Sequence, residues 1–288
     1  MPTFNVAGLP GDDGRLSMVT SSALRTDGPM SLAGEYKRQR AWRDWAAIFD
    51  ALPSLQGRLV LDLGCGVGDQ SAELMNRGAR VIGIDANEAL LQEARAHAFP
   101  NVEFRREDLR ALPDLDVSAD GLWCSFVAAY FPDLPTTLRS WKRHLRSGGW
   151  IVLTEIDNLF GHEPLSAGAH AVFERFAREA LAAKRYDFHM GHKLRGYLEE
   201  SGFTVQREFT LEDRELSLTG AAQVDVVDAW RARLDRLSLR SGLAVDQFER
   251  LREEFLSCLG SANHRSNARV FCCVATSNAD EAVDLQAD

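Results

Sequence analysis

The sequence predicts an α/β protein with a Rossmann-like, seven-stranded, mostly parallel sheet that is flanked by helices and carries added lid helices. Three observations predict this fold class. An apolar run over 58–63 leads into glycines at every second position, at 64, 66 and 68. Strand-like and helix-like segments then alternate as far as residue 156, which is typical of right-handed parallel crossovers. Further helical patterns interrupt the last strand-like segments.

The first half of the chain supplies five of the expected strands. A helix is expected first, over 31–50, because Trp42, Trp45, Ala46 and Phe49 form one apolar stripe. The strands are expected at 58–63, 80–84, 102–106, 120–125 and 150–156. The helices between them are expected at 69–77, 87–97 and 134–145, with a turn at Gly148-Gly149 before the fifth strand.

The second half departs from a minimal core because it is richer in helices. They are expected at 169–184, 191–201, 222–239 and 245–259, and two strands at 203–211 and 268–276. We expect one domain over 31–276, with helical cap insertions at about 157–190 and 213–265. Residues 1–30 are expected to form a flexible segment, and the acidic residues 277–288 a disordered tail.

The composition is that of a globular protein and argues against several kinds of partner. Hydrophobic residues make up 45% of the chain and charged residues 26%. The net charge of −9 argues against a nucleic-acid partner, and no apolar run reaches the length of a membrane span. The five cysteines lack the spacing of a metal site or a disulfide framework. The sequence therefore predicts no metal and a cytoplasmic protein with reduced thiols; a homodimer is left open.

The glycine turn at 64–68 predicts a shelf for a nucleotide-like ligand at the carboxyl end of the first strand. Glycine permits positive φ and lets a ligand approach the main chain closely. Asp85 ends the second strand roughly 20 residues after the turn, the usual offset for an acid that accepts bonds from ribose hydroxyls. The spacing G-x-G-x-G lacks the last glycine of the dinucleotide fingerprint, and Asp69 at the helix start would repel a pyrophosphate. A nucleoside without phosphate is therefore favoured over a dinucleotide.

These motifs resemble those of the class I S-adenosylmethionine (SAM) dependent methyltransferases, most closely the small-molecule enzymes of the ubiquinone/menaquinone-biosynthesis type. The resemblance rests on Asp62–Gly68, Asp85, Glu107–Leu109 and Leu145–Trp150, and covers about residues 35–157. It implies SAM as the cofactor and transfer of its methyl group to O, N or C of a small-molecule acceptor.

The resemblance also implies which residues contact SAM: Tyr36, Arg40, Asp62, Gly64, Cys65, Gly66, Asp85, Ala86, Asp108, Leu109 and Ser125. Among these, Gly64 and Gly66 would hold the methionine part and Asp85 the ribose. Asp108 would bind the adenine amino group, while Leu109 packs on the ring.

Tyr36 and Arg40 have a separate implied role. In related enzymes a helix before the first strand often closes over the SAM carboxylate. The two residues are four apart and share one face of the expected helix, so Arg40 would pair with that carboxylate and Tyr36 would donate to it.

Methyl transfer by in-line displacement depends mainly on positioning and on excluding water. A base is needed only where the acceptor must lose a proton. His162, His189 and His192 lie in the segment expected to cover the site, and Tyr130 follows the fourth strand. These four are the candidate catalytic residues; Glu155, near the end of the fifth strand, is expected to line the site or to serve the structure.

Two other functions fit the same residues. One is a SAM-using enzyme of the same fold with another reaction, such as intramolecular cyclisation of SAM. The other is a nucleotide-binding module without catalysis. Product formed from SAM alone would identify the first, and ligand binding without any product would identify the second.

Overall fold

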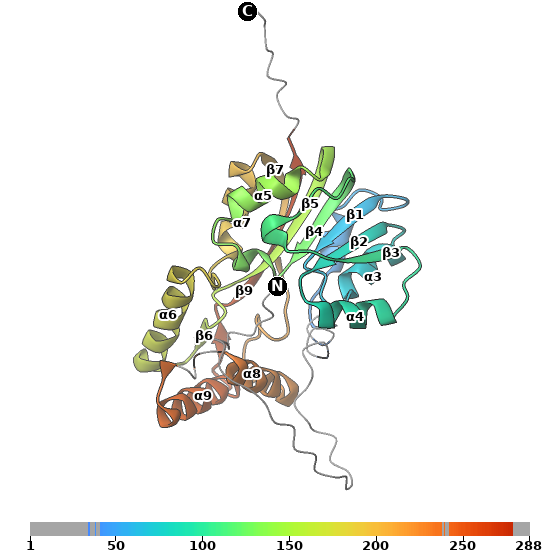
Figure 1. Ribbon diagram of the computed structural model, residues 1–288. Coiled ribbons are helices and arrows are strands. Elements are labelled where there is room, and N and C mark those ends of the chain that lie inside the picture. The colour runs from blue at the N-terminus through green and yellow to red at the C-terminus, as the bar shows by residue number, and fades with distance from the viewer. Residues whose placement is uncertain (1–33, 35–37, 39–40, 238, 240–241, 279–288) are drawn as a thin grey trace, which may run out of the picture.

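The computed structural model describes residues 34, 38, 41–237, 239 and 242–278. Seven strands form one sheet in the order β3-β2-β1-β4-β5-β9-β7 (Figure 1). Their bounds are β1 Leu59–Leu63, β2 Arg80–Asp85, β3 Val102–Arg106, β4 Ala119–Ser125, β5 Leu145–Asp157, β7 Phe203–Leu211 and β9 Arg269–Ser277. Strands β1 to β5 pair in parallel, whereas β9 is antiparallel to both β5 and β7. The predicted Rossmann-like, mostly parallel sheet is therefore confirmed.

Helices cover the sheet and extend beyond one end of it (Figure 1). The α-helices are α2 Ala46–Asp50, α3 Asp69–Asn76, α4 Glu88–Ala96, α5 Leu134–Lys142, α6 Ala167–Ala182, α7 Leu194–Glu200, α8 Val224–Arg236 and α9 Val245–Leu259. Short 3₁₀ turns are η1 Leu109–Ala111, η2 Ala128–Tyr130 and η3 Gly191–Lys193. A two-stranded ribbon of β6 His162–Glu163 and β8 Arg265–Ser266 lies with α6, α8 and α9, past the end of β5.

The central strands are buried on both faces, as parallel strands between helices are. Leu61, Ile84, Leu122 and Val152 are all fully inaccessible to solvent. The burial of apolar side chains such as these is the main favourable contribution to folding. It also holds in place the strand ends at which the candidate site lies.

The expectation of a continuous helix over 31–50 is wrong at residues 42–45. Arg43 pairs there as an isolated β-bridge with Asp213, and α2 begins only at Ala46, whose amide donates to Asp44 Oδ1 at 2.9 Å. The Arg43 Nε lies 2.5 Å from Asp213 Oδ2, and both side chains are almost fully buried. A buried carboxylate without a cation is costly, so this long-range ion pair takes precedence over the helical periodicity.

The fifth strand begins at Leu145, before the glycine pair, so the expected turn at Gly148-Gly149 is wrong. The register on β4 moves from Ala119 opposite Leu145 to Gly121 opposite Trp150, which makes the glycine pair part of a bulge. The indole of Trp150 occupies the space beside Gly121, where a Cβ would lie 2.2 Å from the ring.

Two histidines form the polar centre of the helical part beyond the sheet. His162 and His264 are both fully buried, and Nδ1 of His162 lies 3.0 Å from Nε2 of His264. The His162 ring also packs edge-on against Trp230 and Phe255. Burial lowers the pKa of His162 to about 3, with smaller contributions from His264 and Arg233.

Replacing His162 with Phe should flatten the pH dependence of the unfolding free energy. The folded chain keeps this ring neutral down to about pH 3, whereas the unfolded chain binds a proton below about 6.5. The stability from the neutral ring is thus complete above pH 6.5 and is lost as the pH falls toward 3. Between pH 7.5 and pH 5 the variant should lose about 1–2 kcal/mol less than the wild type, measured by urea unfolding.

The matched control for this prediction is His97→Asn. His97 is exposed just after α4, so the variant should keep the pH dependence of the wild type. An unchanged pH dependence in His162→Phe would contradict the assignment of a neutral buried ring.

Candidate functional site

The carboxyl ends of β1, β2 and β4 lie side by side and create the candidate site. Leu63, at the end of β1, stands opposite Ile84 of β2 and Cys124 of β4. The chain then turns back at once, because the amides of Gly64 and Cys65 both donate to the Ile84 carbonyl, at 2.7 and 3.0 Å. The turn is therefore held to the neighbouring strand by main-chain bonds, and its side chains are not needed for this.

Each of the three glycines in the turn has a positive φ. The values are 79° for Gly64, 55° for Gly66 and 82° for Gly68, a region that other residues rarely adopt. Gly68 also lies under the ring of Phe104, from which a Cβ would be 2.7 Å distant. Glycine is therefore required along the turn, and Gly64 and Gly66 carry no side chain that would keep a ligand from the main chain.

Asp85 connects this turn to the end of β2. Its Oδ2 accepts from the Gly66 amide at 2.9 Å and its Oδ1 from the Asn87 amide at 2.8 Å, while the residue is only 3% exposed. Each carboxylate oxygen can accept a second hydrogen bond, so two acceptor positions remain for a pair of hydroxyls.

Asp62 lies behind the turn and holds the following helix in place. Its Oδ2 accepts from Ser71 Oγ at 2.6 Å, and burial raises its pKa to about 7, opposed by this hydrogen bond. No sequence pattern pointed to Ser71, because a serine inside a helix usually faces solvent or its own backbone. Direct contact of Asp62 with a cofactor stays a prediction.

Asp108 and Leu109 are placed differently from each other. The Asp108 carboxylate is partly exposed and pairs with Arg110, whose guanidinium lowers the pKa of this acid. Leu109 is only 2% exposed, and its carbonyl accepts from Trp141 Nε1 at 3.0 Å. An adenine amino group would share Asp108 with Arg110, so the predicted adenine contact depends on the remaining acceptor positions of that carboxylate.

Ser125, at the end of β4, carries a buried hydroxyl without a hydrogen-bond partner in the described part of the chain. The next residue, Phe126, has a positive φ of 59° and lies under the guanidinium of Arg43, 4.2 Å from the ring centroid. A buried hydroxyl of this kind needs a partner, and a ligand at the strand ends would supply one. Of the other predicted contacts, Cys65 is buried in the turn and Ala86 is half-buried after Asp85.

Tyr130 lies beside a buried acid at the end of β5. Its ring contacts that of Tyr186 edge-on at 4.9 Å, and Tyr186 Oη donates to Glu155 Oε1 at 3.5 Å. Glu155 also accepts from the amides of Ala129 and Ile156, at 3.1 and 2.9 Å. Burial raises its pKa to about 7, against the effect of these bonds. Glu155 is therefore bonded to the η2 loop through the Ala129 amide, and whether it also lines the site stays a prediction.

The three candidate histidines do not come together. His192 is half exposed, and its Nδ1 lies 2.7 Å from Asp157 Oδ1 at the end of β5. His189 is half-buried and its backbone forms a bridge with Asp157. His162 is fully enclosed in the helical part, so its placement gives no support to a catalytic role. Tyr36 and Arg40 lie outside the described residues.

Comparison with known proteins identifies the region around this site. Residues 60–149 match the family model described as a methyltransferase domain. Trans-aconitate 2-methyltransferase of Deinococcus radiodurans is 38% identical over 109 residues, which are 37% of this chain and 40% of that protein. Ubiquinone biosynthesis O-methyltransferase of Paracidovorax citrulli is 33% identical over 113 residues, 38% of this chain and 48% of that protein. The chain thus matches less than half the length of these two relatives.

Solved structures extend the likeness in fold to most of the chain. A SAM-dependent methyltransferase from Methanosarcina mazei superposes with a TM-score of 0.52 at 16% identity, over 82% of this chain and 99% of that one. Together these matches confirm the predicted resemblance to methyltransferases, over residues 60–149 in sequence and over most of the chain in fold.

The residues at the strand ends fit SAM by their own chemistry. Positive-φ glycines leave room for its amino-acid part, Asp85 has two acceptor positions for the ribose, and the Ser125 hydroxyl has no partner among the described residues. No group of three or more potential metal ligands occurs among the described residues. No helix in the described part of the chain has both the length and the apolar character required to cross a membrane.

Replacing Asp85 with Ala should weaken SAM binding by about ten-fold or more, because it removes the ribose acceptors and the partner of the Gly66 amide. Isothermal titration calorimetry measures the affinity. Glu88→Gln is the control, since it removes the same charge from a partly exposed side chain three residues further on, which pairs with Arg95. Equal affinity in Asp85→Ala and the wild type would contradict the ribose assignment.

Replacing Ser125 with Ala should weaken SAM binding and leave the stability of the fold unchanged. The hydroxyl has no described partner to lose, so the unfolding free energy should stay within about 0.5 kcal/mol of the wild type. SAM affinity should fall by about two- to ten-fold, the usual effect of one neutral hydrogen bond. Unchanged affinity in the calorimeter would show that only the backbone of this residue faces the cofactor.

Proposed function

We propose that this protein is a SAM-dependent methyltransferase that moves a methyl group to O, N or C of a small-molecule acceptor. The observation that carries the proposal is the bond between Asp85 and the Gly66 amide. It joins a ribose-type acceptor to a glycine turn inside the region that matches the methyltransferase model. A dinucleotide site would need the third fingerprint glycine, and Asp69 stands in its place.

The chain itself would supply orientation and exclusion of water. Bound SAM brings a methyl carbon on a positively charged sulfur, which an aligned nucleophile can attack in line. Phe126 and Tyr130 follow β4, and Trp45 packs edge-on against Phe126 with ring centroids 6.1 Å apart. We propose that these rings hold the acceptor in line and keep water away from the methyl group.

His192 is the best-placed candidate for removing a proton from the acceptor. The bond between its Nδ1 and Asp157 would fix the ring and leave Nε2 to accept a proton. The half-exposed ring is accessible to a ligand, unlike that of His162. Tyr130 and His189 are the other two groups that we retain for this role.

The wider organisation of the protein is also part of the proposal. We infer that α6, α8 and α9 form a cap over the substrate side of a single methyltransferase domain. All five cysteines are free and buried, which is consistent with reduced thiols in the cytoplasm. The acceptor would be a small molecule, and a homodimer is compatible with these features.

Incubation with methyl-labelled SAM and a panel of acceptors tests the function. The panel holds phenols, amines and carboxylic acids, trans-aconitate included because one relative carries its name. We expect S-adenosylhomocysteine to form only when an acceptor is added, with the label in that acceptor. Product from SAM alone would point to another SAM reaction, and SAM binding with no turnover on any acceptor would favour a binding module.

A further inference from the structure

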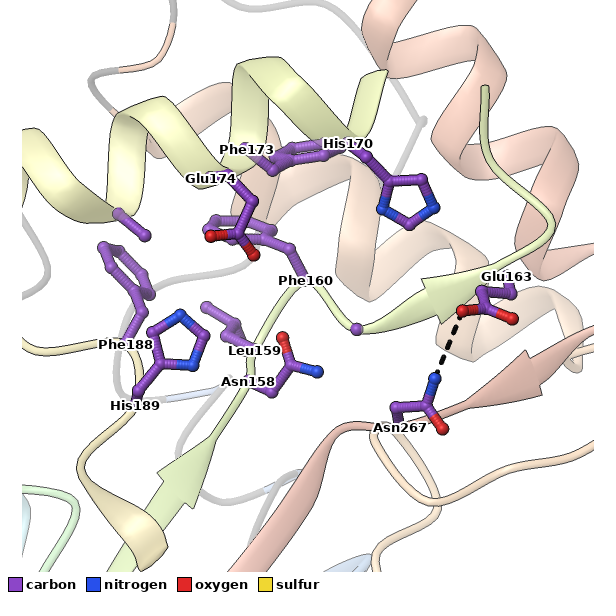
Figure 2. A pocket seen from close by; sticks show the side chains of 12 residues that line it. Asn158, Leu159, Phe160, Glu163, His170, Phe173, Glu174, Phe188, His189 and Asn267 are labelled. Atoms are coloured by element: carbon purple, nitrogen blue, oxygen red, sulfur yellow. Dashed lines mark hydrogen bonds between the residues drawn. The ribbon is translucent and has the colours of Figure 1, made fainter. Parts of the chain in front are cut away.

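A cavity of about 210 Å³ lies between α6 and the chain that leaves β5 (Figure 2). It is separate from the glycine turn and from Asp85. Twelve residues line it: Asn158, Leu159, Phe160, Gly161, Glu163, His170, Phe173, Glu174, Ala177, Phe188, His189 and Asn267. Its volume suits a small organic molecule.

Aromatic rings form the floor of this cavity. Phe160 stacks on Phe173 with ring centroids 4.6 Å apart, and it contacts Phe188 at 5.2 Å. All three side chains are buried. A ligand with an aliphatic or aromatic body would remove the open face of this floor from water, and ring faces also attract a cation.

Four polar side chains form the rim of the cavity. His170 and Glu174 are four residues apart on α6, so they share a face, and Figure 2 shows both directed toward Asn158 and His189 on the opposite side. Among the described residues, none of these four side chains has a hydrogen bond or ion pair to another protein group. The carboxylate oxygens of Glu174 and the amide oxygen of Asn158 are thus available as acceptors.

The charge of the lining selects the ligand. Glu163 is the second carboxylate of the cavity, and it accepts from Asn267 Nδ2 at 3.3 Å. No lysine or arginine is among the twelve lining residues. Two carboxylates in a lining that holds neither lysine nor arginine would repel an anion and attract an ammonium group. A metal ion is disfavoured, since no group of three potential ligands is found in the described part of the chain.

We propose that this cavity binds a small organic cation, with its ammonium group on Glu174 and its apolar body on the phenylalanine floor. The site reaches toward the strand ends through touching rings: Tyr130 contacts Tyr186 at 4.9 Å, and Tyr186 contacts Phe188 at 4.7 Å. The proposal does not rest on methyl transfer, because it concerns binding to Glu174 and the phenylalanine floor, although the cavity also includes His189, one of the groups retained above for proton removal.

Three phenyl compounds of matched size test the proposal by calorimetry on the full chain without SAM. They are 2-phenylethylamine, 2-phenylethanol and phenylacetate, which are cationic, neutral and anionic at pH 7.5. The amine should bind about ten-fold or more tightly than the alcohol, and phenylacetate most weakly, as expected for a bond to a charged acceptor. In Glu174→Gln the preference for the amine should be lost, whereas Glu174→Asp should keep most of it.

Glu179→Gln is the control on the same helix, because Glu179 is exposed and pairs with Arg175 outside the cavity. It should leave the affinity for the amine unchanged. Glu174 is exposed at the rim, so its replacement should not disturb folding. The proposal is overturned if the alcohol or phenylacetate binds as tightly as the amine, if Glu174→Gln keeps the preference, or if none of the three compounds binds.

Discussion

The hydrogen bond between the Asp85 carboxylate and the Gly66 amide is the contact on which the rest of the site depends. It joins the end of β2 to the turn after β1. The three positive-φ glycines of this turn have no side chains that could hold its backbone in place. The other oxygen of the same carboxylate holds the Asn87 amide at the start of α4. One buried acid thus holds two adjacent loops in position, the glycine turn and the start of α4. The predicted cofactor contacts depend on where these two loops lie.

Most of the fold could be predicted from local sequence patterns, because buried strands and amphipathic helices each have a characteristic pattern of apolar residues. Strands β3 and β7 and helix α9 have the bounds that were expected, and most of the other described elements differ by a few residues. The exceptions come from contacts between distant parts of the chain. The Arg43–Asp213 pair interrupts a helix that its apolar stripe predicted, and the Trp150 ring beside Gly121 extends a strand through a glycine pair. No local period encodes such contacts.

In the candidate site, too, some residues could be located from the sequence and others could not. The glycine turn and Asp85 are adjacent to their strands in sequence, so spacing alone could locate them. The contact between Tyr186 and Glu155 joins segments that only the tertiary fold brings together. The i,i+4 pair of His170 and Glu174 on α6 was a usable signal that the sequence analysis passed over. His162 had the right residue type in the right segment, but the fold encloses it among aromatic rings.

The position of β9 has a consequence for how this protein is made. Strand β9 follows both β5 and β7 in the sequence but lies between them in the sheet, antiparallel to both, and it pairs with each along most of its length. While the ribosome has yet to release residues 269–277, β5 and β7 each present an unpaired edge that invites intermolecular association. The part of the sheet that carries the glycine turn can be complete in the nascent chain, but the sheet closes only after residues 269–277 have left the ribosome.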